Sequence, residues 1–209
     1  LDPTWVDKLA RNLRRWDETA ELVVLTHFDP SDFTEPVEVI PLMHPERDWS
    51  TMMECLRPEA IGERAVVIGL DTLALGPLGP LWDRWDSEAH PFVAPPCQYS
   101  PVKWVNGVVG ITGDVASEVW SCWVAERDEA MRDEQFVLHT KFSEMEWMRR
   151  RIRKPSNMWE VVSPEIRQWI PTIGKVDAPP RGVTLLYFAG PIKQDSLAPT
   201  MAWVRETWA

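Results

Sequence analysis

The chain has 209 residues, 44% of them hydrophobic and 26% charged, which is enough apolar material for one sizeable core. Its formal net charge of -10 repels a phosphate backbone, so nucleic acid is excluded as a general partner. The three cysteines form no C-x-x-C pair, which argues against a disulfide framework or a structural zinc site and favours a cytoplasmic location. No apolar run reaches the ~18 residues that a membrane span requires.

The first third of the chain predicts one helix and three strands. Asp2 can cap a helix whose first residue is Pro3, and apolar residues then recur at helical spacing as far as Trp16. Short apolar runs predict strands at 22–25 and 37–40, and the run AVVIGL predicts the strongest strand at 65–70. Because AVVIGL is apolar throughout, we expect a parallel strand that is covered on both faces.

The remainder of the chain predicts further strands and helices. A strand that contains Gly107 and Gly110 is expected at 104–111, and a helix capped by Asp114 follows it. Additional helices are expected at 134–139, 144–153 and 200–208, and additional strands at 158–162 and 183–188. This order indicates the α/β class, with a mainly parallel central sheet in a single domain that spans 1–209.

Position alone makes Asp71 a candidate site residue. Ligands of open α/β sheets bind beyond the carboxyl ends of the strands, and Asp71 directly follows the strongest predicted strand. A carboxylate at this point can hold a divalent cation or a ribose hydroxyl. The alternative is that Asp71 and Thr72 simply begin a turn.

Two polar pairs offer further candidates. Asn106 provides a donor and an acceptor that suit sugar hydroxyls, and Gly107 would let a ligand approach the backbone, although a simple bulge or turn is the better explanation of this pair taken alone. Asp133 and Gln135 stand at the start of a predicted helical stretch, where an acidic side chain also complements the helix dipole.

Basic residues near the end of the chain offer candidate phosphate ligands. Gly190 and Lys193 follow the last predicted strand, and a glycine turn with a nearby lysine can receive a phosphate. The denser basic run at 149–154 is more simply interpreted as a solvated helix face. Motifs of serine hydrolases, zinc proteases and dinucleotide enzymes do not occur in the sequence.

Taken in order, these segments resemble a bacterial and phage branch of the glycogenin-like, GT-A glycosyltransferases. The resemblance runs from Trp5 to Trp208 and is carried by VVLTHFDP (23–30), VEVIPL (37–42), VVIGLDTLALGPLGPLWD (66–83), WVNGVVGI (104–111), DEQFV (133–137) and YFAGPIKQDSL (187–197). It implies a Rossmann-like three-layer sandwich. It also implies transfer of a sugar from a nucleoside-diphosphate sugar, such as a UDP-sugar, to an unknown acceptor with retention of the anomeric configuration.

The resemblance also implies roles for individual residues. In that family a D-x-D motif binds Mn²⁺ or Mg²⁺; Asp71 matches its second aspartate, whereas Gly69 replaces the first. The residues implied near the transferred sugar, and hence in catalysis, are Asp133 and Gln135. The residues implied to bind substrate are Thr26, Asn106, Gly107, Gly190 and Lys193, of which the last two match the family's H-x-G-x-x-K motif.

The departures from the family pattern leave two hypotheses open. One is an active transferase in which Lys193 and the basic run compensate for a weakly held metal ion. The other is a catalytically degenerate domain that binds a nucleotide sugar or a protein partner, as Gly69 and Ala189 at two motif positions suggest. The family also begins with a strand before the first helix, which this sequence lacks.

Overall fold

The computed structural model describes residues 2–44, 49–97, 100–132, 144–153, 155–169, 177–188 and 193–208. Its helices are α1 (Pro3–Arg14), α2 (Pro58–Ile61), α3 (Gly79–Trp82), α4 (Gly113–Arg132), α6 (Glu144–Arg151), α7 (Met158–Val161), α8 (Gln194–Leu197) and α9 (Ala202–Trp208), with 3-10 turns η1 (Pro30–Asp32) and η2 (Trp49–Leu56). Its strands are β1 (Val23–Thr26), β2 (Glu38–Pro41), β3 (Arg64–Ile68), β4 (Thr72–Ala74), β5 (Phe92–Ala94), β6 (Pro96–Cys97), β7 (Ser100–Trp104), β8 (Val108–Thr112), β9 (Ser156–Asn157), β10 (Ile166–Gln168) and β11 (Leu185–Tyr187).

A four-stranded sheet of order β3-β8-β5-β9 separates two hydrophobic cores. Successive side chains of a strand point to opposite faces, and β5 shows this directly, because Val93 enters one core while Phe92 and Ala94 enter the other. In β3, Val66 and Ile68 likewise pack against the first core, and Ala65 and Val67 against the second. The uninterrupted apolar run of β3 therefore reflects coverage on both faces.

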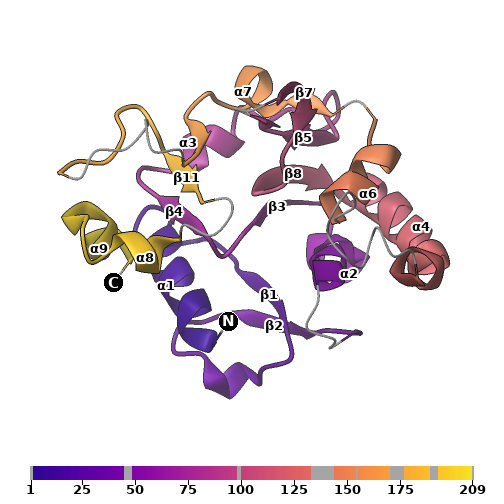
Figure 1. Cartoon of the computed structure of the whole chain (residues 1–209), viewed down its shortest axis with the longest axis horizontal. Coiled ribbons are helices and arrows are strands. Elements are labelled where there is room, and N and C mark those ends of the chain that lie inside the picture. The colour runs from indigo at the N-terminus through magenta and orange to yellow at the C-terminus, as the bar shows by residue number, and fades with distance from the viewer. Residues whose placement is uncertain are drawn as a thin grey trace.

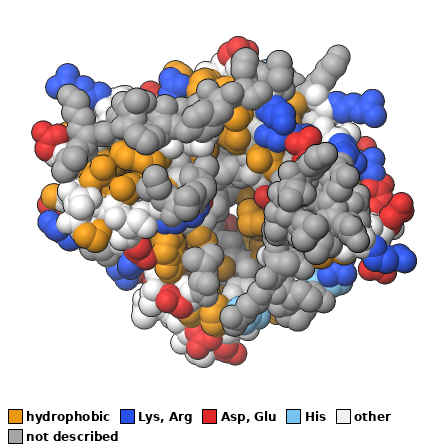
Figure 2. Space-filling model, viewed as in Figure 1, with side chains coloured by type: hydrophobic (Ala, Val, Ile, Leu, Met, Phe, Trp, Pro, Cys, Tyr) orange, Lys and Arg blue, Asp and Glu red, His pale blue; other side chains and the backbone are white. Residues whose placement is uncertain are grey.

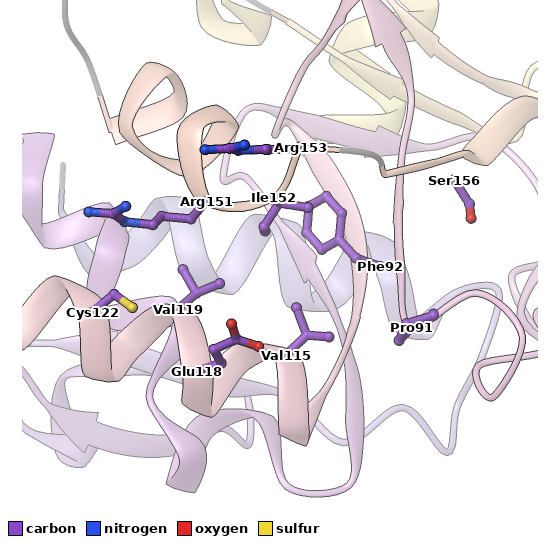
Figure 3. A pocket seen from close by; sticks show the side chains of 10 residues that line it. All are labelled: Pro91, Phe92, Val115, Glu118, Val119, Cys122, Arg151, Ile152, Arg153 and Ser156. Atoms are coloured by element: carbon purple, nitrogen blue, oxygen red, sulfur yellow. The ribbon is translucent and has the colours of Figure 1, made fainter.

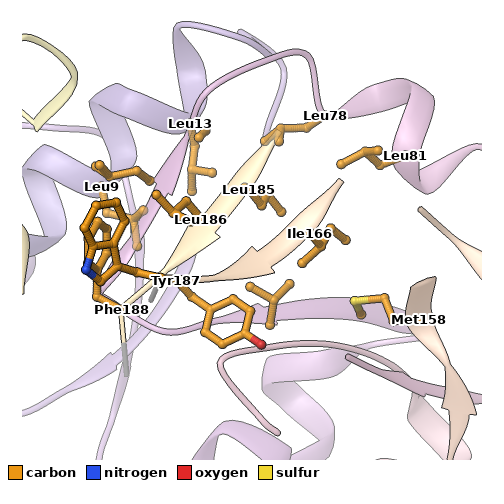
Figure 4. Close-up of a cluster of buried hydrophobic side chains, with 14 of the residues drawn as sticks. Leu9, Leu13, Leu78, Leu81, Met158, Ile166, Leu185, Leu186, Tyr187 and Phe188 are labelled. Carbon is orange, nitrogen blue, oxygen red and sulfur yellow. The ribbon is translucent and has the colours of Figure 1, made fainter. Parts of the chain in front are cut away.

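Different elements cover the two faces of this sheet. The first core, drawn in part in Figure 4, joins side chains of α1, α9, β4, β10 and β11. The second core joins side chains of η2, α2, α4 and α6. In Figure 1, α1, α8 and α9 accordingly lie on one side of the strands, and α2, α4 and α6 lie on the opposite side.

The prediction of a mainly parallel central sheet was wrong, because the sheet is mixed. Strand β8 is antiparallel to both β3 and β5, and only β5 and β9 are parallel within it. An apolar run indicates that both faces of a strand are buried. Helices or a second sheet can bury both faces of an antiparallel strand just as they bury those of a parallel one. Hydrophobicity therefore indicated the burial of β3 and not its direction.

Three smaller sheets complete the described strands, and one of them is the antiparallel pair β6-β7. In the sheet of order β10-β11-β4, Tyr187 lies opposite Thr72, so the end of β11 is brought beside the start of β4. Strands β1 and β2 pair in parallel, from Val23 opposite Glu38 to Thr26 opposite Pro41. Within the described ranges, β1 pairs only with β2 and β3 only with β8.

Local capping signals explain where several elements begin. The Asp2 carboxylate accepts the Thr4 backbone N–H at 2.9 Å, so α1 starts at Pro3 as expected. The strand predicted at 158–162 is instead helix α7, because the Asn157 side chain caps it by accepting the Trp159 N–H at 3.0 Å. The strand predicted at 104–111 is divided into β7 and β8, and the connection between them carries Asn106 and Gly107.

Among the ranges that the structure describes, no helix combines the length and the apolar character needed to cross a membrane.

Candidate functional site

Asp71 lies in the short connection between β3 and β4. Strand β3 ends at Ile68 and β4 begins at Thr72, so the Asp71 carboxylate is placed at the carboxyl end of the strongest predicted strand. The Phe188 N–H donates to the Asp71 carbonyl oxygen at 2.8 Å, which extends the pairing between β11 and β4 by one residue. This hydrogen bond fixes the backbone from which the carboxylate projects.

The Lys193 ammonium reaches the Asp71 carboxylate from the far end of the chain. Its Nζ donates to Asp71 Oδ2 and to the Phe188 carbonyl oxygen, the latter at 2.8 Å. The two side chains are partly exposed, at 34% for Lys193 and 28% for Asp71. Ion pairs with this exposure stabilise a fold by ~1 kcal/mol or less, so the fold does not depend on this contact.

Two buried polar residues flank the ion pair and were not proposed as ligands from the sequence. Gln194 is fully buried; its Nε2 donates to the Leu70 carbonyl oxygen at 3.4 Å, and its Oε1 has no partner. The Thr72 hydroxyl is also buried and without a partner. Buried polar atoms are normally hydrogen-bonded, so these two mark polar capacity beside Asp71 that none of the described residues uses. The sequence could have indicated Thr72 and Gln194 as site residues only because each is adjacent to Asp71 or Lys193.

The Asn106–Gly107 connection lies directly against the Asp71 segment. The Gly69 N–H donates to the Gly107 carbonyl oxygen at 2.9 Å. A Cβ atom built on Gly107 would lie 2.6 Å from Cδ2 of Tyr187, so the tyrosine ring fills the space that the glycine leaves. Tyr187 therefore occupies the side of Gly107 that a side chain would take, and the expectation that a ligand approaches the Gly107 backbone stays a prediction. Asn106 Nδ2 lies 3.5 Å from Glu144 Oε1, a distance at the limit of a hydrogen bond.

Tyr187 anchors this arrangement from the core side. Its ring belongs to the first core, as Figure 4 shows, and its hydroxyl is buried without a partner. Burial raises the pKa of Tyr187 above its ordinary value, so the phenol stays neutral across the physiological range. A neutral, buried ring packs against Gly107 and does not act as a base.

The remaining predicted site residues are placed as follows. Thr26 ends β1, where its buried hydroxyl accepts the Phe28 N–H at 3.2 Å. Asp133, Gln135 and Gly190 lie outside the described residues. The structure thus brings Asp71, Gly107 and Lys193 together and places Asn106 beside Gly107, whereas Thr26 is engaged in its own turn.

The described residues around Asp71 do not fit a divalent metal ion. In the described part of the chain, no three His, Cys, Asp or Glu side chains form a group that could hold one. Residue 69, where the family motif has its first aspartate, is a glycine whose Cβ position lies 2.7 Å from Asp71 Oδ1. Asp71 Oδ2 is already bound by Lys193. Mg²⁺ and Mn²⁺ require several oxygen ligands, and one occupied carboxylate does not provide them.

Two arginines of the basic run at 149–154, which begins within α6, form contacts inside the protein. Arg149 donates through Nε to the Trp104 carbonyl oxygen at 3.1 Å and through Nη1 to Glu146 at 3.0 Å. Arg151 pairs with Glu126 and lies over the Trp147 ring. These two guanidinium groups hold α6 in place, so they do not supply charge to Asp71.

A cavity of about 250 Å³ opens beside the second core and is separate from this site (Figure 3). Phe92, Val115, Val119 and Ile152 provide most of its apolar wall, and Glu118, Arg151 and Arg153 provide charges. None of its lining residues belongs to the segments around Asp71 and Lys193.

The face that carries the β3–β4 connection is hollowed. Figure 2 shows a hollow near the centre of the view, between the positions that β4 and β3 occupy in Figure 1, with hydrophobic side chains on both sides. Charged side chains gather mainly around the outline of this face.

This architecture is shared with solved structures of a galactosyltransferase. LgtC in complex with donor and acceptor sugar analogues matches with a TM-score of 0.61 and 13% sequence identity, over 98% of this chain and 91% of that chain. The chain has a glycosyltransferase fold. An active-site mutant of LgtC, in which a glutamine is replaced by glutamate, matches this fold with a TM-score of 0.58 and 14% identity over the same shares of the two chains.

The glycosyltransferase fold is established here by structure alone. Neither a protein-family model nor a curated protein sequence matches the chain.

Proposed function

We propose that this protein is a glycosyltransferase that moves a sugar from a nucleoside-diphosphate sugar to an acceptor. The observation that carries the proposal is the meeting of Asp71 and Lys193 at the carboxyl end of β3, within a fold shared with a galactosyltransferase. These residues are 122 positions apart, and the family resemblance assigns both to the donor site. Their contact supports the assignment, because it puts both residues at the same place in the fold.

Lys193 is proposed to bind the donor diphosphate. During transfer, the bond between the anomeric carbon and the phosphate oxygen breaks, and the nucleoside diphosphate leaves with the electron pair. The acceptor oxygen forms the new bond to the anomeric carbon, and the proton of the acceptor hydroxyl passes to an oxygen of the departing diphosphate. A preformed positive charge beside the departing phosphate stabilises the charge that develops there.

The other roles follow from the family resemblance. Asp133 and Gln135 are proposed to act on the transferred sugar, and the active-site glutamine of LgtC supports a glutamine in such a role. Thr26, Asn106, Gly107 and Gly190 are proposed to contact substrate. Asp71 is not proposed as a metal ligand, because its surroundings do not fit a metal ion.

A donor panel tests the proposal. Purified protein is incubated with UDP-, GDP-, ADP-, CDP- and dTDP-sugars, and release of the nucleoside diphosphate is measured with and without acceptor sugars. Lys193→Met is expected to lower the release rate ~10²-fold or more, in the range seen when a stabilising donor is removed. Lys8→Met is a matched control, because Lys8 forms a similarly exposed pair with Asp195 at 3.4 Å.

One observation favours a second candidate, a domain that binds a nucleotide sugar without transferring it. The Asp71 carboxylate is already paired with Lys193, and among the described residues it belongs to no group of three His, Cys, Asp or Glu side chains that could hold a metal ion. Saturable binding of a donor without release of diphosphate in the panel would support this candidate against the transferase.

A further inference from the structure

We propose that the nucleoside-diphosphate site works without a divalent metal ion, with the Lys193 ammonium in the metal's place and Asp71 as its positioning residue. This inference rests on the proposed function and specifies how that same site holds its donor. It reverses the role that the sequence motif gives Asp71, from metal ligand to anchor of a lysine.

The first support is the occupation of Asp71. Lys193 Nζ contacts Asp71 Oδ2, and the other oxygen, Oδ1, faces Gly69 so closely that a Cβ atom there would lie 2.7 Å away. A cation bound to this carboxylate would lie within a few ångströms of the ammonium. Two positive charges at that separation repel each other, so metal binding requires that Lys193 first leave Asp71.

The second support is the crowding at residue 69. A carboxylate at this position would need a Cβ atom, whose site also lies 3.4 Å from the Gly107 carbonyl oxygen. The backbone here is fixed, because the Gly69 N–H donates to that same carbonyl. Gly69 therefore does more than remove a metal ligand, because its missing side chain lets Asp71 and Gly107 approach this segment closely.

The third support is the geometry of Lys193 itself. An ammonium group has three N–H donors, and two are used by Asp71 Oδ2 and the Phe188 carbonyl oxygen. No described residue takes the third, so it is left for a ligand, and the side chain is 34% exposed. A phosphate oxygen is the partner that a positioned ammonium binds most strongly, through a charge-assisted hydrogen bond.

The two roles of Asp71 predict opposite effects of Asp71→Asn. If Asp71 holds a metal, the substitution removes a charged ligand and weakens the binding of nucleoside diphosphate. If Asp71 positions Lys193, asparagine keeps an oxygen that accepts from the ammonium and removes a negative charge beside the bound phosphate. Affinity is then kept or increased.

Isothermal titration with UDP, GDP, ADP, CDP and dTDP, each in EDTA and each in Mn²⁺, separates these cases. For the nucleotide that binds, we expect dissociation constants in EDTA and in Mn²⁺ that agree within about 2-fold. Lys193→Met should weaken binding ~10-fold or more, the loss typical of a hydrogen bond to a charged group. Asp71→Asn should bind as tightly as the wild type or more tightly, and Lys8→Met should bind like the wild type. Thermal unfolding of each variant verifies that it is folded.

Each outcome bears on a different proposal. Binding that Mn²⁺ strengthens ~10-fold, with the gain abolished by Asp71→Asn, overturns the metal-free site and leaves the transferase proposal standing. Binding in EDTA that needs Lys193 but leads to no sugar release supports the metal-free site and overturns the transferase proposal. No binding of any nucleotide in either condition overturns both.

Discussion

A Cβ atom on Gly107 would lie 2.6 Å from Cδ2 of Tyr187, whose side chain is only 2% exposed. The tyrosine is held in strand β11 opposite Thr72, so its ring has little freedom to retreat. Gly107→Ala therefore forces a shift of either the ring or the β7–β8 connection. We expect this overpacking to lower the free energy of unfolding by ~1–3 kcal/mol, measured by urea denaturation.

Gly79→Ala is the control for this prediction. A Cβ atom on Gly79 would meet nothing within 4 Å, and Gly79 is the first residue of helix α3. Because Gly79 precedes Pro80, whose ring disfavours helical backbone for a residue that has a Cβ, the gain usual for alanine in a helix is reduced, and we expect stability to change by less than ~1 kcal/mol in either direction. Equal stabilities of the Gly107 and Gly79 variants would contradict the packing role assigned to Gly107.

Asn12 joins α1 to β4 through both edges of its amide. Its Nδ2 donates to the Ala74 carbonyl oxygen at 3.0 Å, and its Oδ1 accepts the Ala74 N–H at 2.7 Å. The side chain is 1% exposed, so Asn12→Leu leaves the Ala74 N–H buried without its partner. We expect a loss of ~1–3 kcal/mol in the free energy of unfolding.

A second substitution separates the two hydrogen bonds of Asn12. Asn12→Asp keeps an oxygen to accept the Ala74 N–H but places a second oxygen against the Ala74 carbonyl. If the amide donor matters, the aspartate variant should be unstable at neutral pH and should recover as acid protonates the carboxylate. A pH series of urea denaturation curves measures this, and equal, pH-independent stabilities of the aspartate variant and the wild type would contradict the assignment.

Glu54 holds the segment after β2 from within the protein. Its carboxylate is 1% exposed and accepts the N–H groups of Met43 and His44, each at 2.7 Å. It also pairs at 3.1 Å with Arg57, which donates to the Pro41 carbonyl oxygen at 2.7 Å. Arg57 also pairs with the half-exposed Glu59, so Glu54→Gln removes the buried one of its two charge partners. We expect a loss of ~1–3 kcal/mol in the free energy of unfolding, because buried N–H donors then face an amide in place of a carboxylate.

The same carboxylate-to-amide change at the surface should have almost no effect. Asp128 lies 3.6 Å from Arg127 and is 86% exposed, so Asp128→Asn is expected to change the free energy of unfolding by less than ~1 kcal/mol. Urea denaturation of both variants in low and high salt checks the comparison. The Glu54 effect should persist in high salt, because buried charges are screened little.

The extents of several elements could be predicted because local chemistry determines them. The cap at Asp2, the apolar run of β3 and the closing helix α9 each follow from short-range spacing. Strand direction could not be predicted in this way. A neighbouring strand satisfies the backbone hydrogen bonds of β3 in either direction, and β8 does so as an antiparallel strand. The run at 158–162 has a strand-like composition, but the Asn157 cap at its start selects a helix.

The sequence indicated that Asp71 and Lys193 are candidate site residues, but it did not indicate that they form an ion pair with each other. The rule that ligands bind beyond strand ends identified Asp71, and the motif order identified Lys193. That the two would pair with each other depends on the path of β11 beside β4, which no local pattern encodes. For Gly107, the sequence shows where space is left, but only the fold shows that Tyr187 fills it.

Asp7 on α1 anchors the chain that follows η1. Its Oδ1 accepts the N–H groups of Thr34 and Glu35, each at 3.0 Å, and its Oδ2 accepts the Thr34 hydroxyl at 2.8 Å. Burial by itself would raise the pKa of Asp7, but these hydrogen bonds outweigh it and lower the pKa below the ordinary value of 3.8. The folded protein therefore holds this carboxyl in its ionised form more firmly than the unfolded chain does.

A carboxyl with a lowered pKa in the folded state contributes stability that is complete above 3.8 and is lost as the pH falls through the folded pKa. Asp7→Asn keeps an oxygen for the two backbone N–H groups but does not titrate, so its stability lacks this contribution at every pH. We expect the difference in unfolding free energy between the wild type and Asp7→Asn to be constant near neutral pH and to shrink below 3.8. Other carboxyls, such as Asp29, titrate in both proteins and cancel. Urea denaturation across a pH series measures the difference, and a value that stays constant into acid would show that Asp7 is not held in this way.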